Sequence, residues 1–269
     1  MSQAPLAAAS RPRDADSTAG SRLRVALYAR SLREHVGSSR IVLGLTAELA
    51  RKGHAVDVYA ERIVPGLVTA CGGVPRRALP AWLPHGIARR LYPPVARSRR
   101  ATRLLARGGY DLVIGNGDLG QQDIFLLHNM VWREAEELDA FADPRYRAML
   151  DWQEHCLTDH RFRLLVANSR LMQADVCARY GVPAARVAVV HPAIDPALFS
   201  RDGAAAQRAA TRAGLGIADG VPLLGFITSG HFRLRGADTL VELAAALVAG
   251  GHPDLRVLAV CNQRNGDDL

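Results

Sequence analysis

A strand–loop–helix–strand pattern near the start of the chain constrains the fold most. Leu23–Ala29 is an apolar run typical of a buried strand, and His54–Ala60 alternates as a second strand would. The helix expected between them has an apolar face that repeats at helical spacing: Ile41, Val42, Leu45 and Leu49. Such a unit favours an α/β domain built on parallel strands.

The loop Arg30–Ser38, between the first strand and this helix, has one glycine, Gly37, and Ser38 or Ser39 can cap the helix that follows. It contains no GxGxxG, so a dinucleotide fingerprint is not supported. Gly37 and Ser38 stand at a helix start, where free N–H groups can bind an anion. The alternative is that both residues only begin the helix.

A second strand–turn–helix pattern lies at residues 222–243. Leu223–Thr228 reads as a buried strand, and the polar turn Ser229–Arg235 carries Arg233 and Arg235. Gly236 then opens a helix whose apolar positions have helical spacing: Leu240, Val241, Ala244, Leu247 and Val248. Free N–H groups at a helix start, together with two guanidiniums, would form a diphosphate clamp. The alternative is an ordinary turn with solvated arginines.

The rest of the chain continues the α/β alternation. Residues 133–160 are expected to be helical, with an interruption near Asp143-Pro144, and Ser169 is expected to cap a helix over 170–180 that Gly181 ends. The further strands expected are Tyr110–Gly115, Asp123–His128, Leu164–Ala167, Val187–Val190 and Leu255–Cys261.

Three segments resemble GT-B glycosyltransferases of the family-4 kind. They are VGSSRIVLGLTAELARKGHAVDVY (36–59), LLVANSRLMQADVCARYGVPAARVAVVHPAIDPALF (164–199) and ITSGHFRLRG (227–236). Two departures stand out: Gly37 replaces the family's usual double glycine, and Arg235-Gly236 replaces its Lys-Gly pair.

The resemblance implies an α/β, GT-B-like fold of two Rossmann-like domains, the second one incomplete. The expected division is a disordered tail over 1–21, an acceptor-side domain over 22–192 and a partial nucleotide-sugar domain over 193–269. Members of the family continue into a Glu-x7-Glu segment that contacts the donor sugar and nucleotide. This sequence has no such segment, so the chain looks truncated in its donor domain.

The resemblance also implies a function. A sugar would move from a nucleotide-diphosphate sugar to a hydroxyl of a saccharide or lipid-linked acceptor, with retention, in the synthesis of a cell-surface glycan or glycolipid. His128 would help orient the sugar; its alternative is a loop histidine bonded to backbone. The residues expected to hold donor phosphate are Arg233, Arg235, Gly236, Gly37 and Ser38. No cofactor and no metal is expected.

Two other classes of function stay open. The chain could be an inactive remnant that only binds an acceptor or a membrane, or a GT-B relative that acts as a sugar-phosphate synthase or epimerase. A metal site at Asp151, His155 and Asp159, which share a helical face, is disfavoured against a solvated polar face.

Positive charge is concentrated in one stretch. The net charge is +8, and no acidic residue lies between Glu61 and Asp111. On the expected helix there, Ala101, Leu104 and Leu105 lie opposite the arginines. This stretch favours an anionic membrane patch, with a solvated surface as the alternative, formed by Arg89, Arg90, Arg99, Arg100, Arg103 and Arg107. Nucleic acid is disfavoured, because only Trp82 and Tyr92 interleave with the arginines.

The remaining composition points to a cytosolic protein. The four cysteines are scattered, with no CxxC pair, which fits reduced thiols. No apolar run is long enough to cross a bilayer, and no signal peptide is recognised. We expect a cytoplasmic location, with peripheral association at the inner face of the membrane.

Overall fold

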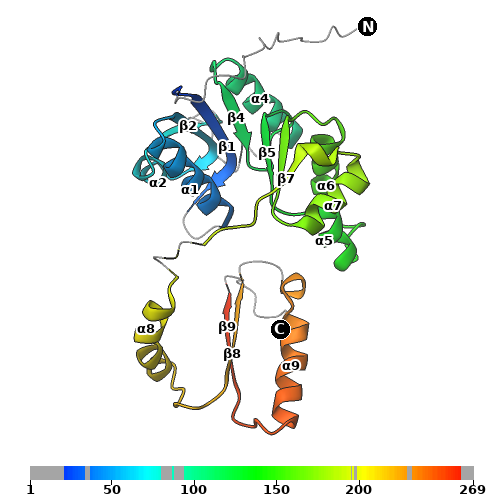
Figure 1. The fold of residues 1–269 in the computed structure, drawn as a ribbon. Coiled ribbons are helices and arrows are strands. Elements are labelled where there is room, and N and C mark those ends of the chain that lie inside the picture. Colours follow the sequence, from blue (N-terminus) through cyan, green and yellow to red (C-terminus); the bar gives the residue numbers. More distant parts are fainter. Residues whose placement is uncertain are drawn as a thin grey trace. The chain divides into compact units, whose positions relative to one another are not determined.

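The computed structural model describes residues 21–33, 37–79, 87, 94–194, 196, 199–228 and 232–261 of the chain (Figure 1). The chain divides into two compact units, residues 1–124 and 125–269. The expected N-terminal tail lies outside the described residues, apart from Ser21. The domain boundary expected after residue 192 stays a prediction.

Seven strands form one sheet in the order β3-β2-β1-β4-β5-β6-β7. The pairs β1–β2, β1–β4, β2–β3 and β6–β7 are parallel, which confirms the α/β class. The strands are β1 (Arg24–Leu32), β2 (Ala55–Ile63), β3 (Val74–Arg77), β4 (Leu112–Gly115), β5 (Ile124–Leu127), β6 (Leu164–Ala167) and β7 (Val187–Val189). A second, two-stranded parallel sheet pairs β8 (Leu223–Thr228) with β9 (Arg256–Cys261).

Helices follow most strands, as expected for parallel connections. In chain order they are α1 (Gly37–Arg51), α2 (Pro65–Ala70), α4 (Pro94–Ala106), α5 (Val131–Glu137), α6 (Pro144–Thr158), α7 (Arg170–Tyr180), α8 (Arg201–Gly214) and α9 (Ala237–Ala249), with short 3₁₀ turns η1 (Ala184–Arg186) and η2 (Arg233–Arg235).

The first unit buries the central residues of β1. Val25–Ala29 are all 2% exposed or less, which for a strand requires cover on both faces. On one face, Ala101 and Leu105 of α4 join a core cluster with Tyr28 and Tyr59. α1 packs on β1 and β2.

The start of α1 differs from the sequence expectation. The helix begins at Gly37, so neither Ser38 nor Ser39 is its cap. The Ser39 hydroxyl accepts from the Arg33 N–H (3.2 Å) and donates to the Ser31 carbonyl (3.3 Å), which attaches the first helical turn to the end of β1. The expected apolar face is also partly wrong: Ile41 is 39% exposed, while the polar residues Ser39 and Thr46 are buried.

Three elements were not expected from the sequence. β3 is a four-residue strand with the sequence VPRR. Because two of its four residues are arginines, it lacks the apolar pattern that predicts a strand. It exists because it pairs with β2 over Asp57–Ala60. The short helix α2 lies between these strands, and α8 follows the first sheet with Ser200 as its cap.

The part that contains β8, η2, α9 and β9 has a small core. Phe226 of β8, Phe232 before η2 and Ala237 of α9 are buried together, and Leu240 packs against them. The two phenyl rings lie 6.3 Å apart between centroids. This cluster joins β8 to the residue before η2 and to the start of α9.

Candidate functional site

His128 directly follows β5, at the carboxyl end of a parallel strand. Ligands of open α/β sheets bind at this edge. The amide Nδ2 of Asn168, which follows β6, donates to the His128 carbonyl (2.9 Å). His191, which follows β7, bonds through Nδ1 to the carbonyl of Asn168 (3.1 Å). Residues after three neighbouring strands are therefore joined, and Asn168 is the residue that joins them.

Gln153 of α6 clamps the turn after His128. Its Nε2 donates to the Asn129 carbonyl and its Oε1 accepts from the Val131 N–H, both at 2.9 Å. The side chain is buried, as are Met130 and Val131. These bonds hold the backbone of the turn that follows His128. Gln153 was not predicted from the sequence, because nothing in its own segment signals a bond to a loop so far along the chain.

The protonation state of His128 follows from its surroundings. The side chain is half-buried, and burial lowers the pKa of its imidazole because it disfavours the charged form. Burial therefore favours the neutral imidazole of His128. A neutral imidazole has one donor and one acceptor nitrogen and suits hydroxyl groups.

The turn between β8 and α9 places two arginines beside a helix start. Arg233 and Arg235 lie on η2 with exposed side chains. Gly236, at φ 83°, is the N-cap of α9 and has no capping side chain. Residues with φ in this region are usually glycine. The strand Leu223–Thr228 and the helix start after Gly236 are confirmed; the predicted role in holding phosphate stays a prediction.

Phe232 sets the geometry of this turn and was not predicted from the sequence. Its carbonyl accepts from the N–H groups of Arg235 (3.0 Å) and Ala237 (3.1 Å). Its ring is 4% exposed in the small core. The first turn of α9 also carries Asp238, so attraction for an anion rests on the two guanidiniums and the free N–H groups.

Gly37 and Ser38 begin α1 next to the end of β1. A Cβ added at Gly37 would meet nothing within 4 Å, so the fold itself does not demand glycine there. Gly37 is exposed and Ser38 is half-buried.

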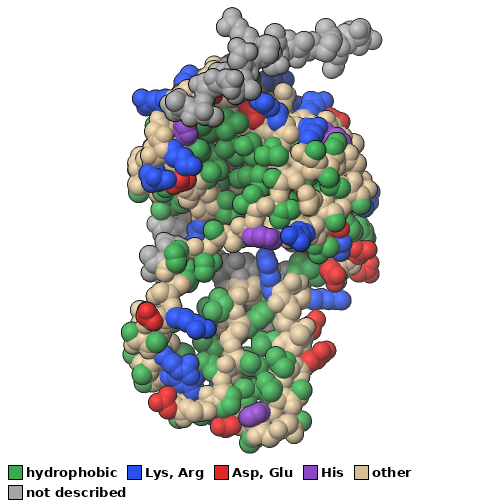
Figure 2. Space-filling model, viewed as in Figure 1, with side chains coloured by type: hydrophobic (Ala, Val, Ile, Leu, Met, Phe, Trp, Pro, Cys, Tyr) green, Lys and Arg blue, Asp and Glu red, His purple; other side chains and the backbone are tan. Residues whose placement is uncertain are grey.

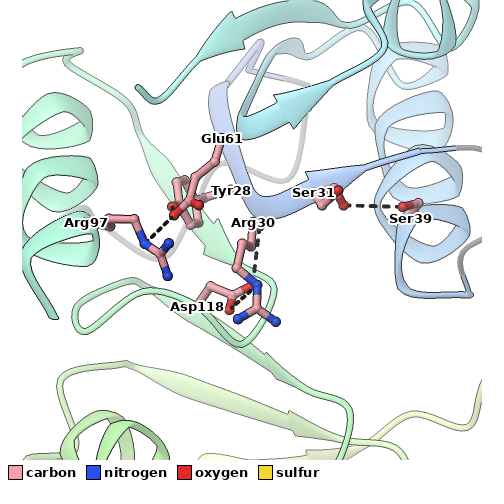
Figure 3. Close-up of polar contacts among 7 residues, drawn as sticks. All are labelled: Tyr28, Arg30, Ser31, Ser39, Glu61, Arg97 and Asp118. Atoms are coloured by element: carbon pink, nitrogen blue, oxygen red, sulfur yellow. Dashed lines mark hydrogen bonds and ion pairs between the residues drawn. The ribbon is translucent and has the colours of Figure 1, made fainter. Parts of the chain in front are cut away.

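A cluster of charged residues near the carboxyl ends of β1 and β2 was not predicted (Figure 3). Glu61 of β2 accepts from the Tyr28 hydroxyl (3.4 Å) and pairs with Arg97 of α4 (3.2 Å). Asp118, after β4, pairs with Arg30 of β1 (3.7 Å). Although Arg97 belongs to the arginine-rich stretch, it is 8% exposed and faces inward.

The family model named Glycosyltransferase Family 4 matches residues 36–198, more than half of the chain. The chain belongs to Glycosyltransferase Family 4. The matched stretch includes Gly37, Ser38 and His128; Arg233, Arg235 and Gly236 lie beyond it.

Curated relatives of this family-4 chain are two proteins named D-inositol 3-phosphate glycosyltransferase. The one from Kineococcus radiotolerans is 29% identical over 235 residues, covering 79% of this chain and 52% of that protein. The one from Nocardioides sp. is 28% identical over 241 residues, covering 82% and 51%. The chain thus spans about half the length of the curated relatives it matches.

A solved structure has a similar fold. WaaG, described as a glycosyltransferase involved in lipopolysaccharide biosynthesis, superposes with a TM-score of 0.65 at 17% identity, covering 89% of this chain and 64% of that chain. At this identity the likeness bears on the fold, and it confirms the expected GT-B architecture.

The arginine-rich stretch of this family-4 chain contains a hollow along α4. Among the described residues its lining consists of Val95, Ala96, Leu104 and the four arginines Arg99, Arg100, Arg103 and Arg107. Ala101 and Leu105 are buried as expected, and Leu104 packs against the same core cluster while also reaching the edge of the hollow. Arg89 and Arg90 lie outside the described residues.

Two absences hold only for the part of the chain that the structure describes. No helix there is long and apolar enough to span a bilayer. No three His, Cys, Asp or Glu side chains there come together in a group that could hold a metal ion, and Asp151, His155 and Asp159 form no such group.

Proposed function

We propose that this protein transfers a sugar from a nucleotide-diphosphate sugar to a hydroxyl group of an acceptor, with retention of anomeric configuration. The observation that carries the proposal is the turn at η2. Arg233 and Arg235 stand there beside the N-terminus of α9, which no side chain of the described residues caps, in a chain that belongs to Glycosyltransferase Family 4.

The η2 turn would serve the leaving group. Negative charge grows on the diphosphate as its bond to the sugar breaks, and groups already in place for that charge lower the barrier. Arg235, next to Gly236, would bind the diphosphate, and Arg233 would add a second guanidinium. The helix N-terminus supplies N–H donors and the positive end of its dipole.

His128 would orient a sugar. A neutral imidazole can form a hydrogen bond with a sugar hydroxyl, and the Gln153 and Asn168 bonds hold the backbone at and after His128. Gly37 and Ser38 would line the donor phosphates or the sugar, since the position of Gly37 is open and tolerates a close approach.

We propose that the reaction needs no metal ion, because the two arginines and the helix N-terminus carry the charge that a cation neutralises elsewhere. Turnover should then persist in excess EDTA. The acceptor class is proposed from the names of the curated relatives: a phosphorylated cyclitol or a related saccharide, free or lipid-linked.

Release of nucleoside diphosphate from a panel of nucleotide sugars tests the function. We expect release with one or a few donors, increased by inositol phosphate or a saccharide acceptor, and a product whose anomeric configuration NMR shows to be retained. Binding of a donor without turnover would favour an inactive binding module. Turnover of a sugar phosphate instead of a nucleotide sugar would favour the synthase or epimerase alternative.

A specific observation supports membrane contact as part of this function. The four arginines that line the α4 hollow all have exposed side chains, and no acidic residue lies between Glu61 and Asp111. Each arginine near an anionic bilayer contributes on the order of 1 kcal/mol. Such a patch would bring the protein to a lipid-linked acceptor.

Sedimentation with liposomes tests the patch. We expect binding to phosphatidylserine-containing liposomes that falls as salt is added, and loss of binding when Arg99, Arg100, Arg103 and Arg107 are all changed to Gln. The matched control changes four exposed arginines elsewhere to Gln: Arg161, Arg163, Arg201 and Arg208. Equal sedimentation of both variants, or equal binding to neutral and anionic liposomes, would contradict this proposal.

A further inference from the structure

Two side chains from separate elements hold the short segment that begins with His128. Asn168, which follows β6, donates from Nδ2 to the His128 carbonyl (2.9 Å). Gln153 of α6 donates from Nε2 to the Asn129 carbonyl and accepts at Oε1 from the Val131 N–H, both at 2.9 Å. These partners lie 40, 24 and 22 residues apart in the sequence. The segment is therefore held by distant elements that pack onto it.

The Gln153 amide is used at both of its ends. Val131 is the first residue of α5, and the N–H groups of a first helical turn have no partner within the helix. Gln153 supplies that partner from α6. The residue is 7% exposed, so water does not readily replace a lost bond. Only a side chain that both donates and accepts can serve the two peptide groups, which excludes a carboxylate and every apolar side chain.

Asn168 is itself held from both sides. It directly follows Ala167, the last residue of β6, whose carbonyl accepts from the Val190 N–H at 2.9 Å. The next residue, Ser169, caps α7 by accepting from the Met172 N–H at 3.1 Å. A strand end and a helix start therefore fix the backbone from which the Asn168 amide reaches its partner carbonyl.

We propose that Gln153 and Asn168 are positioning residues, which set the place of the His128 imidazole for the proposed sugar transfer. The part assigned to His128 in the transfer rests on the proposed function, whereas the dependence of its position on the two amides does not. The His128 side chain is half-buried and its own carbonyl is one of the held groups, so a shift of that backbone moves the imidazole with it. A displacement of about 1 Å in a positioned group can lower turnover about a hundredfold.

NMR titration of the His128 imidazole C–H signals, assigned by their loss in His128→Ala, tests the positioning without an assay of activity. Burial holds the pKa of His128 below its ordinary value of 6.5. Gln153→Met removes two bonds and Asn168→Leu removes one, and both variants nearly keep the side-chain size and add no charge. Glu134 and His191, titratable groups that bond to this network, are unchanged in both variants. We expect the midpoint of the His128 titration to move up toward 6.5 in each variant, because a loosened imidazole gains access to water.

The matched control is Gln173→Met on α7. Gln173 Nε2 donates to the Val187 carbonyl, at the start of β7 (3.0 Å). This variant loses a bond of the same kind that does not involve the segment after His128, so the His128 midpoint should stay unchanged. Circular dichroism checks that each variant is folded, and Asn168→Leu carries the test if Gln153→Met unfolds the chain.

Double-mutant cycles in the donor-release assay test the effect on turnover. We expect Gln153→Met and Asn168→Leu each to lower kcat by about tenfold to a hundredfold, with donor KM changed less, because His128 would orient the sugar while the arginines at η2 hold the diphosphate. In the His128→Ala background the same two substitutions should change kcat by less than about twofold, since residues that act through one group are not additive. A merely structural role would lower kcat equally in both backgrounds.

Three results would overturn the proposal: an unchanged His128 midpoint in both variants, an equal shift in Gln173→Met, or losses of kcat that are as large without the His128 imidazole. An absence of donor turnover in the wild type would instead reject the proposed function. The NMR titration would still decide whether the two amides position His128, so the two failures are distinguishable.

Discussion

β1 and β8 have similar apolar sequences and differ greatly in burial. In β1, Val25–Ala29 are 2% exposed or less, whereas in β8 only Phe226 is buried and Ile227 is 79% exposed. β1 pairs with strands on both sides and is covered by helices, while β8 pairs with β9 in a two-stranded sheet. An apolar run thus predicts a strand, but its neighbours decide how much of it is buried.

The same contrast holds for the helices. α4 buries Ala101 and Leu105 against the first sheet despite its many arginines. α9 is far more apolar, yet Val241, Leu243 and Val248 are 62%, 46% and 46% exposed. Figure 2 shows apolar side chains at the surface over β8, β9 and α9. The proposed phosphate clamp therefore stands on the less buried of the two regions.

Hydrogen exchange gives the largest expected contrast. We expect roughly a thousandfold slower amide exchange in Val25–Ala29 and Leu164–Ala167 than in Leu223–Thr228. Opening free energies within one protein range from near zero to the global stability. The strand Leu223–Thr228 belongs to a two-stranded sheet, which is only marginally stable alone. Mass spectrometry of the 269-residue chain measures it. Equal protection from exchange in β1, β6 and β8 would contradict this expected difference.

The buried ion pair in the first unit gives the next largest effect. Arg97→Ala leaves the buried Glu61 without its partner, so the free energy of unfolding should fall by about 3–5 kcal/mol. Urea titration followed by circular dichroism measures the change. The matched control is Arg103→Ala on the exposed side of α4, for which we expect a change within about 0.5 kcal/mol. A similar small change at Arg97 would show that the pair does not hold α4 to the sheet.

Arg235→Ala tests whether the less buried region, which contains β8, η2 and α9, stabilises the leaving diphosphate. Loss of a group that stabilises developing negative charge lowers turnover by about a hundredfold or more, which is the loss we expect in donor release. Protection of β8 from exchange should not change, because the Arg235 side chain is exposed. Arg208→Ala, at an exposed position of α8, is the control. Turnover within twofold of wild type would remove Arg235 from the proposed mechanism.

The pH dependence of stability gives the smallest effect. Burial raises the pKa of Glu61 above its ordinary value of 4.5, so the folded chain keeps that proton to higher pH than the unfolded chain. Stability gained from this group is present below pH 4.5 and is lost as pH rises from there through the raised pKa. The loss amounts to about 1.4 kcal/mol for each pH unit between the unfolded and folded pKa values.

Glu61→Gln should therefore flatten the decline of the unfolding free energy above pH 4.5, measured by urea titration at successive pH values. The pKa of His128 is lowered by burial, so its contribution has the opposite sign, but it is common to both proteins and cancels. Glu48 serves as a control whose pKa shift has the opposite sign: a hydrogen bond from Arg51 lowers the pKa of Glu48. If the unfolding free energies of the wild type and Glu61→Gln declined in parallel with pH, Glu61 would not be the cause of the decline.

The elements that sequence predicted well are those whose signals are local. β6 and β8 lie at the expected residues, and α7 begins after the Ser169 cap and ends at Gly181, as expected. A capping hydroxyl, a glycine with positive φ and a short apolar run act within a few residues, so they can be read without the rest of the chain. The helix start after Gly236 follows for the same reason.

The tertiary structure alone decided which polar residues are buried together. Arg97 lies among exposed arginines in the sequence, and it becomes an interior residue because the face of α4 that meets Tyr28 and Tyr59 also presents Arg97 to Glu61. Gln153 and Asn168 act on the His128 loop from separate elements. Partners so distant along the chain leave no periodic trace, since their pairing depends on how helices and strands pack rather than on local spacing. The sequence therefore determined where the candidate phosphate clamp lies, and packing determined the polar cluster at Glu61.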